Sequence, residues 1–229
     1  MDQMKRYAVY YAPRPGAFAD ATAQWLGWDS TTGLAVPQPA VPQLYAPLDA
    51  ITADPRRYGF HGTLRAPFRL AQGISGLHLA QCVSDLARTL APVVCAGLRL
   101  ENLHGFVALT PSGCEAALLQ LAAVVVERTN ILRAPLTEAE RARRRPQSLT
   151  TRQRSLLDQW GYPHVMEEFQ FHLTLTGPLP DDQAAAVQAA AAAHLSPVLP
   201  RPFTIEDLCV FGEDAAGRFH LIHRYPLSG

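Results

Sequence analysis

The sequence predicts an α+β protein in which two lobes, each an antiparallel sheet with helices, flank a central cleft. Segments with the patterns of strands and helices follow one another in the order strand, helix, hairpin, and this order occurs twice. Each copy opens on nearly the same five residues, 60–64 (FHGTL) and 171–175 (FHLTL). Because a solenoid needs more copies, a repeat of this size that occurs only twice indicates a duplicated lobe.

The first half of the chain opens on a strand over 6–11, which is rich in tyrosine and valine and stops before two prolines. A short helix over 17–26 ends at a glycine. The proline-rich stretch 33–55 has little periodicity and predicts a long surface loop. The first copy of the repeat then comprises a strand, a helix and the two strands of a hairpin: 60–65, 77–90, 93–103 and 106–109.

The second half begins with a helix over 115–129. A polar, arginine-rich insertion follows over 133–168 and contains a helix at 151–160. The second copy comprises a strand, an alanine-rich helix capped by an aspartate, and the two strands of a hairpin: 169–176, 181–194, 203–211 and 218–225.

These elements predict one bilobal domain over residues 1–229. The first lobe covers about 12–110 and the second about 111–229, with the insertion 133–168 inside the second. The N-terminal strand, 6–11, can join the sheet of either lobe.

The candidate catalytic residues lie in the two repeated segments. On a strand, residues i and i+2 point to the same face. Each copy therefore presents an imidazole beside a hydroxyl, His61 with Thr63 and His172 with Thr174. If a pseudo-twofold axis relates the lobes, the two strands face each other across the cleft, and all four side chains meet around one small anion.

Two histidines suit the hydrolysis of a phosphodiester. One takes a proton from the attacking water and the other protonates the leaving alkoxide, and histidine can do either near neutral pH. The threonine hydroxyls can donate hydrogen bonds to the non-bridging phosphate oxygens. A single H-x-T is a weak signal, since a lone buried histidine is more often part of the core. Its repetition at an equivalent position favours paired catalysts.

The tetrads 61–64 (HGTL) and 172–175 (HLTL) resemble the H-x-[ST]-apolar signature of the two-histidine phosphoesterase superfamily. Its members include cyclic nucleotide phosphodiesterases and RNA end-processing enzymes. The resemblance implies a bilobal α+β fold with antiparallel sheets around a central cleft. It also implies that this chain opens a small cyclic phosphodiester without a metal ion.

Three longer segments, 56–68 (RRYGFHGTLRAPF), 133–137 (RAPLT) and 160–163 (WGYP), resemble a branch of the superfamily encoded beside phosphonate-degradation genes. The similarity covers nearly the whole chain. It implies a ribosyl cyclic phosphate, left by cleavage of a carbon–phosphorus bond, as the substrate. The sequence departs from the branch at Arg65, where lysine is expected, so the charge is kept but the donor geometry differs.

Five further side chains are candidates for binding the substrate. Arg65 and Thr176 each lie two residues beyond a motif threonine and share its strand face; a solvent-facing strand end is the alternative. A tyrosine of the first strand can touch the sugar, and Tyr11 is the candidate, although core packing is more common for a single tyrosine. The insertion can act as a lid that brings Arg144 and Tyr162 to a second phosphate, or its arginine run can be a solvated helix.

Composition bears on partners and location. The chain has 20 basic and 20 acidic side chains, a formal net charge of zero, and a single lysine, Lys5. Because no overall basic field is present, a small phosphorylated substrate is expected rather than a nucleic acid. With no apolar stretch of membrane-spanning length or secretory signal, a cytoplasmic protein is expected. The composition says nothing of the oligomeric state.

No metal or cofactor site is expected. The sequence contains no HExxH, P-loop or dinucleotide fingerprint, and its other histidines lack metal-ligand spacing. The four cysteines form no CxxC pair and are expected to be free buried thiols. They are Cys82, Cys95, Cys114 and Cys209.

Three other functions remain open. RNA end processing as a cyclic phosphodiesterase, or 2′,5′ RNA ligation, uses the same chemistry but needs a groove for a polyanion. A non-catalytic module can retain the motifs to hold a phosphorylated ligand. Finally, both histidines can be structural, in which case their replacement lowers stability without removing an activity.

Overall fold

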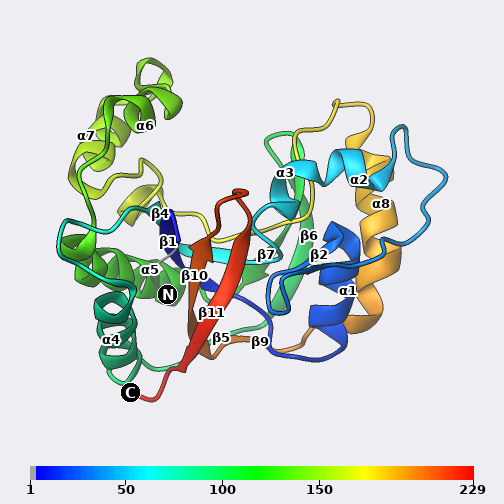
Figure 1. The fold of residues 1–229 in the computed structure, drawn as a ribbon. Coiled ribbons are helices and arrows are strands. Elements are labelled where there is room, and N and C mark those ends of the chain that lie inside the picture. The colour runs from blue at the N-terminus through cyan, green and yellow to red at the C-terminus, as the bar shows by residue number, and fades with distance from the viewer. Residues whose placement is uncertain (1–3) are drawn as a thin grey trace.

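The computed structural model describes residues 4–229 and is built around a seven-stranded antiparallel sheet (Figure 1). The order of its strands is β11-β10-β1-β4-β8-β7-β6. In chain order they are β1 (Arg6–Tyr11), β4 (Gly62–Phe68), β6 (Gly97–Leu103), β7 (Phe106–Ser112), β8 (Leu173–Thr174), β10 (Asp207–Glu213) and β11 (Phe219–Pro226). Two small sheets pair β2 (Trp28–Asp29) with β3 (Leu34–Ala35) and β5 (Val93–Cys95) with β9 (Phe203–Ile205).

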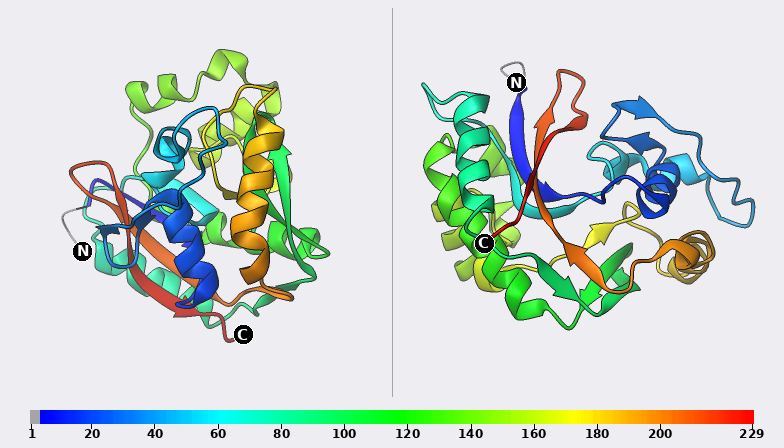
Figure 2. Two further views of the ribbon diagram at one scale, coloured as in Figure 1. Left: turned by 90° about the vertical axis from the view of Figure 1, so that its right-hand side faces the viewer. Right: turned by 90° about the horizontal axis from the view of Figure 1, so that it is seen from below.

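The helices divide into two groups, one toward each end of this strand order (Figures 1 and 2). Helices α4 (Gly76–Ala87) and α5 (Glu115–Thr129) pack on strands β4, β10 and β11 and form the α4–α5 lobe. Helices α1 (Ala17–Leu26) and α8 (Ala184–Leu195) pack on each other, and α8 packs on β6 and β7, which gives the α1–α8 lobe. The predicted α+β fold with two lobes is therefore confirmed.

The lobes interleave the two halves of the chain. Strand β8, from the second copy of the repeat, pairs with β7 from the first. The hairpin β10–β11, from the second copy, pairs with β1, and β1 pairs in turn with β4 from the first. Strand pairing thus crosses the predicted division into 12–110 and 111–229, and each lobe takes strands from both sides of it. The N-terminal strand lies in the α4–α5 lobe.

The helix ends follow local signals. Helices α1, α5 and α7 (Thr151–Trp160) have the predicted bounds. At the start of α7 the hydroxyl of Thr150 accepts a hydrogen bond from the backbone N–H of Gln153, and Gly161 ends the helix in the left-handed conformation with φ 78°. Short 3-10 segments at 130–132, 146–148, 166–168 and 196–198 extend helices or connect them to the next segment.

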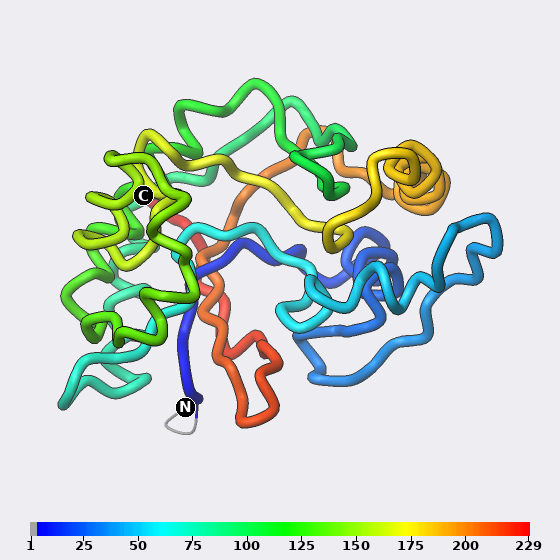
Figure 3. The backbone as a smooth tube through the Cα atoms, turned by 90° about the horizontal axis from the view of Figure 1, so that it is seen from above, coloured from blue at the N-terminus to red at the C-terminus, as the bar shows by residue number. Residues whose placement is uncertain are grey.

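The structure differs from prediction in two loops and one strand. The stretch 33–55 contains β3 and two single-turn helices, α2 (Leu48–Ile51) and α3 (Ala53–Arg56). The insertion contains a further helix, α6 (Glu138–Arg143), and lies with α7 beside the α4–α5 lobe, as the tube in Figure 3 shows. The strand predicted over 169–176 pairs only at Leu173–Thr174.

Two of the four cysteines are not free thiols. Cys95, at the end of β5, forms a disulfide with Cys114, which precedes α5. Cys82 and Cys209 are free, and burial raises the pKa of the Cys209 thiol to about 11. The expectation of four free thiols is therefore wrong for the first pair. Gly97 pairs with Ser112 at the open end of the β6–β7 hairpin, and the two cysteines, 19 positions apart, lie opposite each other two residues beyond this pair.

Across residues 4–229, none of the helices combines the length and the apolar character that crossing a bilayer requires.

Candidate active site

The two repeated motifs meet at the centre of the sheet. Gly62 pairs with Leu173, which joins β4 to β8. Because the strands are antiparallel, this register places His61 beside Thr174 and Thr63 beside His172. The two strands do not face each other across a cleft, as the sequence suggested, but are hydrogen-bonded neighbours. All four motif side chains still share one face of one sheet.

The opposite face of the same strands is packed into the core. Leu64 and Leu173 are 1% and 0% exposed. At Gly62 a Cβ would lie 2.2 Å from the ring of Phe171, so only glycine leaves room for this ring. The alternation of the strands therefore anchors the apolar residues on one side and holds the histidines and threonines on the other.

A cavity of about 530 Å³ lies on the polar face. His61, Thr63 and Thr174 line it, together with residues from β1, from α3 and from the insertion. His172 is half-buried at its edge, with its ring 5.6 Å from that of Phe106, which does line the cavity. His172 is close enough for its charge to lower the pKa of His61.

His61 is held by its backbone and by an aromatic neighbour. Its Nδ1–H donates to the carbonyl oxygen of Gly59 over 2.9 Å. This contact leaves Nε2 as the nitrogen that can exchange a proton. The ring of Tyr10 lies 4.1 Å away, centroid to centroid. Loss of hydration on burial, with a smaller effect of His172, lowers the pKa of His61 to about 4.

His172 is held in the same way. Its Nδ1–H donates to the carbonyl oxygen of Gln170 over 2.8 Å, again two residues earlier in the chain. Burial lowers its pKa below the usual 6.5, and the neighbouring His164 lowers it further. Both imidazoles are therefore neutral near pH 7 in the free protein. A phosphate anion between them would raise both pKa values and favour protonation of one of them.

Arg65, which was predicted to share the strand face of Thr63, is buried in the wall of the cavity. Its side chain is 2% exposed and lines the cavity. Nη2 donates to the Oδ1 of Asn130 over 3.1 Å, while Nε and Nη1 have no hydrogen-bond partner. Burial and the neighbouring Arg133 lower the pKa of Arg65 to about 9. The guanidinium still carries its charge at pH 7, without a counterion.

The other predicted binding residues separate into three cases. Arg144 and Tyr162 both line the cavity, with the guanidinium of Arg144 4.8 Å from the centre of the Tyr162 ring. Thr176 lines it as well, but its Oγ1 accepts a hydrogen bond from the backbone N–H of Val107, which gives it a structural role. Contrary to the prediction, Tyr11 does not face the cavity, since its ring packs in the core against Phe171 and Phe203. Tyr10, on the other face of β1, is the tyrosine of this strand that lines the cavity.

The cavity is strongly basic although the chain is neutral. Seven arginines and two carboxylates line it: Arg6, Arg57, Arg65, Arg69, Arg133, Arg143 and Arg144, with Asp54 and Glu140. Composition could not reveal this asymmetry, because the compensating acidic residues lie elsewhere on the molecule.

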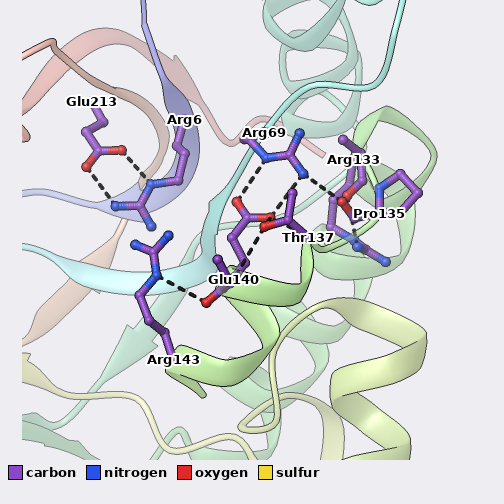
Figure 4. Close-up of polar contacts among 10 residues, drawn as sticks. Arg6, Arg69, Arg133, Pro135, Thr137, Glu140, Arg143 and Glu213 are labelled. Carbon is purple, nitrogen blue, oxygen red and sulfur yellow. Dashed lines mark hydrogen bonds and ion pairs between the residues drawn. The ribbon is translucent and has the colours of Figure 1, made fainter. Parts of the chain in front are cut away.

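Two of these arginines are neutralised by carboxylates (Figure 4). Arg6 forms a bidentate salt bridge with Glu213, and Arg69 forms a bidentate salt bridge with Glu140 of α6. The second pair ties the insertion to the end of β4. Hydrogen bonds from Arg69 and from the backbone of Thr137 lower the pKa of Glu140 to about 2. Arg133, also in Figure 4, donates only to neutral oxygens, those of Asn130, Ala134 and Gln159.

Within residues 4–229, no three histidine, cysteine or acidic side chains are grouped closely enough to hold a metal ion. The polar side chains at and beside the motif face include the two imidazoles, the two threonine hydroxyls, the arginines and three tyrosines.

A family model, described as "Protein of unknown function (DUF1045)", matches residues 63–220. The chain belongs to this family. The matched region contains Thr63, the second motif and the cavity residues between them, whereas His61, Tyr10 and the other cavity residues before position 63 lie outside it.

Two curated relatives of this DUF1045 chain carry the name "Ribose 1,5-bisphosphate phosphokinase PhnN". The protein from Janthinobacterium sp. (strain Marseille) is 37% identical over 237 residues, which cover 100% of this chain and 52% of that protein. The protein from Laribacter hongkongensis (strain HLHK9) is 37% identical over 216 residues, which cover 93% of this chain and 49% of that protein. The chain thus spans about half the length of the curated relatives it matches.

Solved structures are more distant. A structure titled as a phosphoesterase gives a TM-score of 0.45 at 17% identity and covers 99% of this chain and 100% of its own. TT0787 of Thermus thermophilus gives 0.47 at 15%, with 98% of both chains covered. E. coli LigT, solved with NADP+, gives 0.39 at 16%, with 99% of both covered. All three align over nearly the whole chain, with TM-scores below 0.5.

Proposed function

We propose that this protein is a phosphoesterase that opens a small cyclic phosphodiester with His61 and His172 as paired proton-transfer groups. One observation carries the proposal: the two H-x-T pairs lie side by side on one sheet face, each imidazole held through Nδ1 so that Nε2 is free. Two residues of one type, oriented alike beside a basic cavity, fit acid–base catalysis better than two separate structural roles.

The reaction follows from this arrangement. The neutral imidazole takes a proton from water as the water oxygen forms a bond to phosphorus. The bond from phosphorus to the ring alkoxide breaks, and the protonated imidazole of the other motif gives its proton to that oxygen. Thr63 and Thr174 donate hydrogen bonds to the non-bridging oxygens, where negative charge increases. The product is a phosphomonoester, and no step calls for a metal ion.

We infer a ribosyl cyclic phosphate as the substrate class. The curated relatives are named for a kinase that acts on a phosphorylated ribose, and the chain accounts for only about half of them. A phosphoesterase joined to such a kinase would sensibly act on a related sugar phosphate. The name PhnN also agrees with the branch, encoded beside phosphonate-degradation genes, that segments 56–68, 133–137 and 160–163 resemble.

The test is an assay of purified protein, with chelator present, against ribose 1,2-cyclic phosphate and nucleoside 2′,3′-cyclic phosphates. We expect turnover by wild type and a loss of about 10²–10⁴-fold in His61→Ala and in His172→Ala. His223→Ala is the matched control, since His223 is exposed on β11 and does not line the cavity. Circular dichroism checks that each variant is folded.

The alternatives give different results in the same assay. Activity that survives both substitutions would refute the paired mechanism. Tight binding of the cyclic phosphates without turnover would indicate a binding module. Turnover confined to RNA carrying a terminal cyclic phosphate, with strong salt dependence, would indicate RNA end processing.

A further inference from the structure

Five of the seven cavity arginines form no ion pair with a carboxylate among residues 4–229. They are Arg57, Arg65, Arg133, Arg143 and Arg144. Arg65 and Arg133 share a neutral acceptor, the Oδ1 of Asn130, and the charge of Arg133 lowers the pKa of Arg65. A buried guanidinium with two unbonded nitrogens is costly unless a ligand completes it.

The position of Arg65 is set by the strand that carries the first motif. Arg65 lies two residues beyond Thr63, so its Cα is about 7 Å further along the same face of β4. The insertion supplies further cavity residues: Arg133 opens it, Arg144 follows α6, and Tyr162 lies beneath Arg144 just after α7. Arg65 therefore lies further along the sheet than Thr63 by about the width of a sugar ring, and Arg133 lies beside it, on the shared acceptor Asn130.

We propose that Arg65, Arg133, Arg144 and Tyr162 form a second anion subsite, which binds a phosphomonoester on the same substrate. The proposal rests on the proposed function for the first subsite, where the cyclic phosphodiester lies. Three uncompensated cations suit a dianion better than a carboxylate or a sugar hydroxyl, and planar guanidinium groups match phosphate oxygens. The substrate is thus a cyclic phosphate of a sugar that is phosphorylated at a second position.

The second phosphate would also explain why a buried cation is retained. A phosphate between Arg65 and Arg144 would accept hydrogen bonds from the free Nε or Nη1 of Arg65. Since Arg144 belongs to the insertion and Arg65 to β4, the same ligand would hold the insertion over the cavity.

The binding test uses ribose 5-phosphate, which carries the second phosphate but no cyclic ester. We expect it to raise the Tm of wild type and of His172→Ala, and not that of Arg65→Gln. Arg99→Gln, an exposed arginine on β6, is the control and should respond like wild type. Equal shifts in wild type and Arg65→Gln, or no shift in wild type, would overturn the subsite. Without ligand, Arg65→Gln should be at least as stable as wild type, because it removes an unpaired buried charge.

The kinetic test compares ribose 1,2-cyclic phosphate with and without a 5-phosphate. Arg65→Gln should lower kcat/KM for the phosphorylated substrate by about 10- to 100-fold, through KM, and change the other by less than about threefold. Equal losses on both substrates would refute the subsite while leaving hydrolysis intact. Binding of ribose 5-phosphate that depends on Arg65, without turnover of either cyclic ester, would instead refute the proposed function and leave the subsite.

Discussion

The two copies of the repeated motif are alike at their histidines and threonines and unlike just beside them. Both imidazoles donate Nδ1–H to the carbonyl two residues earlier. Four residues beyond each histidine, however, the first copy has Arg65, unpaired and facing the cavity, and the second has Thr176, bonded to the backbone of β7. The central pair therefore suits a symmetric reaction, whereas the position beside it carries a charge only in the first copy.

The residue between histidine and threonine also differs. The first copy has Gly62 where the second has Leu173, and these two residues face each other across the strand pair. Glycine is required because the ring of Phe171 occupies the space that a side chain would need. The two strands can therefore lie in register only if one of them gives up its side chain at this point.

Making the copies identical at this position should have the largest effect. In Gly62→Leu the new side chain collides with Phe171, so β4 and β8 must separate, and we expect destabilisation of about 3 kcal/mol or more. Urea unfolding measures it, with Gly97→Ala as a control, since a Cβ at Gly97 meets its nearest atom at 3.4 Å. The smaller variant Gly62→Ala should also lose stability, and adding Phe171→Leu should recover part of that loss. Stability losses that simply add would show that the two residues do not compete for space.

The pH dependence of catalysis should reveal how alike the two histidines are. Both pKa values lie below 6.5 in the free protein, that of His61 at about 4, so raising the pH removes the proton that the acid must carry. We expect kcat/KM to be highest below pH 6.5 and to decrease above it, by an amount that approaches about tenfold per pH unit. The pH optimum of kcat should be higher than that of kcat/KM, because bound phosphate raises both pKa values. A kcat/KM that rises from pH 6.5 to 8 would contradict this assignment.

The smallest effect is expected at the second copy's outer position. Thr176→Val removes the acceptor for the buried N–H of Val107 and should cost about 1–3 kcal/mol of stability. Its effect on kcat/KM should be the same for substrates with and without a second phosphate, in contrast to Arg65→Gln. Denaturant unfolding and the paired kinetic assay measure the two quantities. A selective loss on the phosphorylated substrate would place Thr176 in the second subsite as well.

Sequence alone determined the parts of this protein that depend on neighbouring residues. The bounds of α1, α5 and α7 follow from glycine caps and apolar spacing, and the two-residue period of a strand was enough to place His61 beside Thr63 and His172 beside Thr174. The same period separated Tyr10 from Tyr11, but it could not tell which face was the cavity and which the core.

Only the tertiary structure decided what depends on residues distant in the chain. Strand pairing interleaves the two halves, because hydrogen bonding between strands imposes no order along the sequence. Seven arginines gather in one cavity of a chain with no net charge. Arg65 was recognisable as a candidate from its spacing, but its burial and lack of a counterion result from helices and an insertion that fold over β4. Burial and charge at one point are sums over the whole fold, whereas strand and helix periods are local.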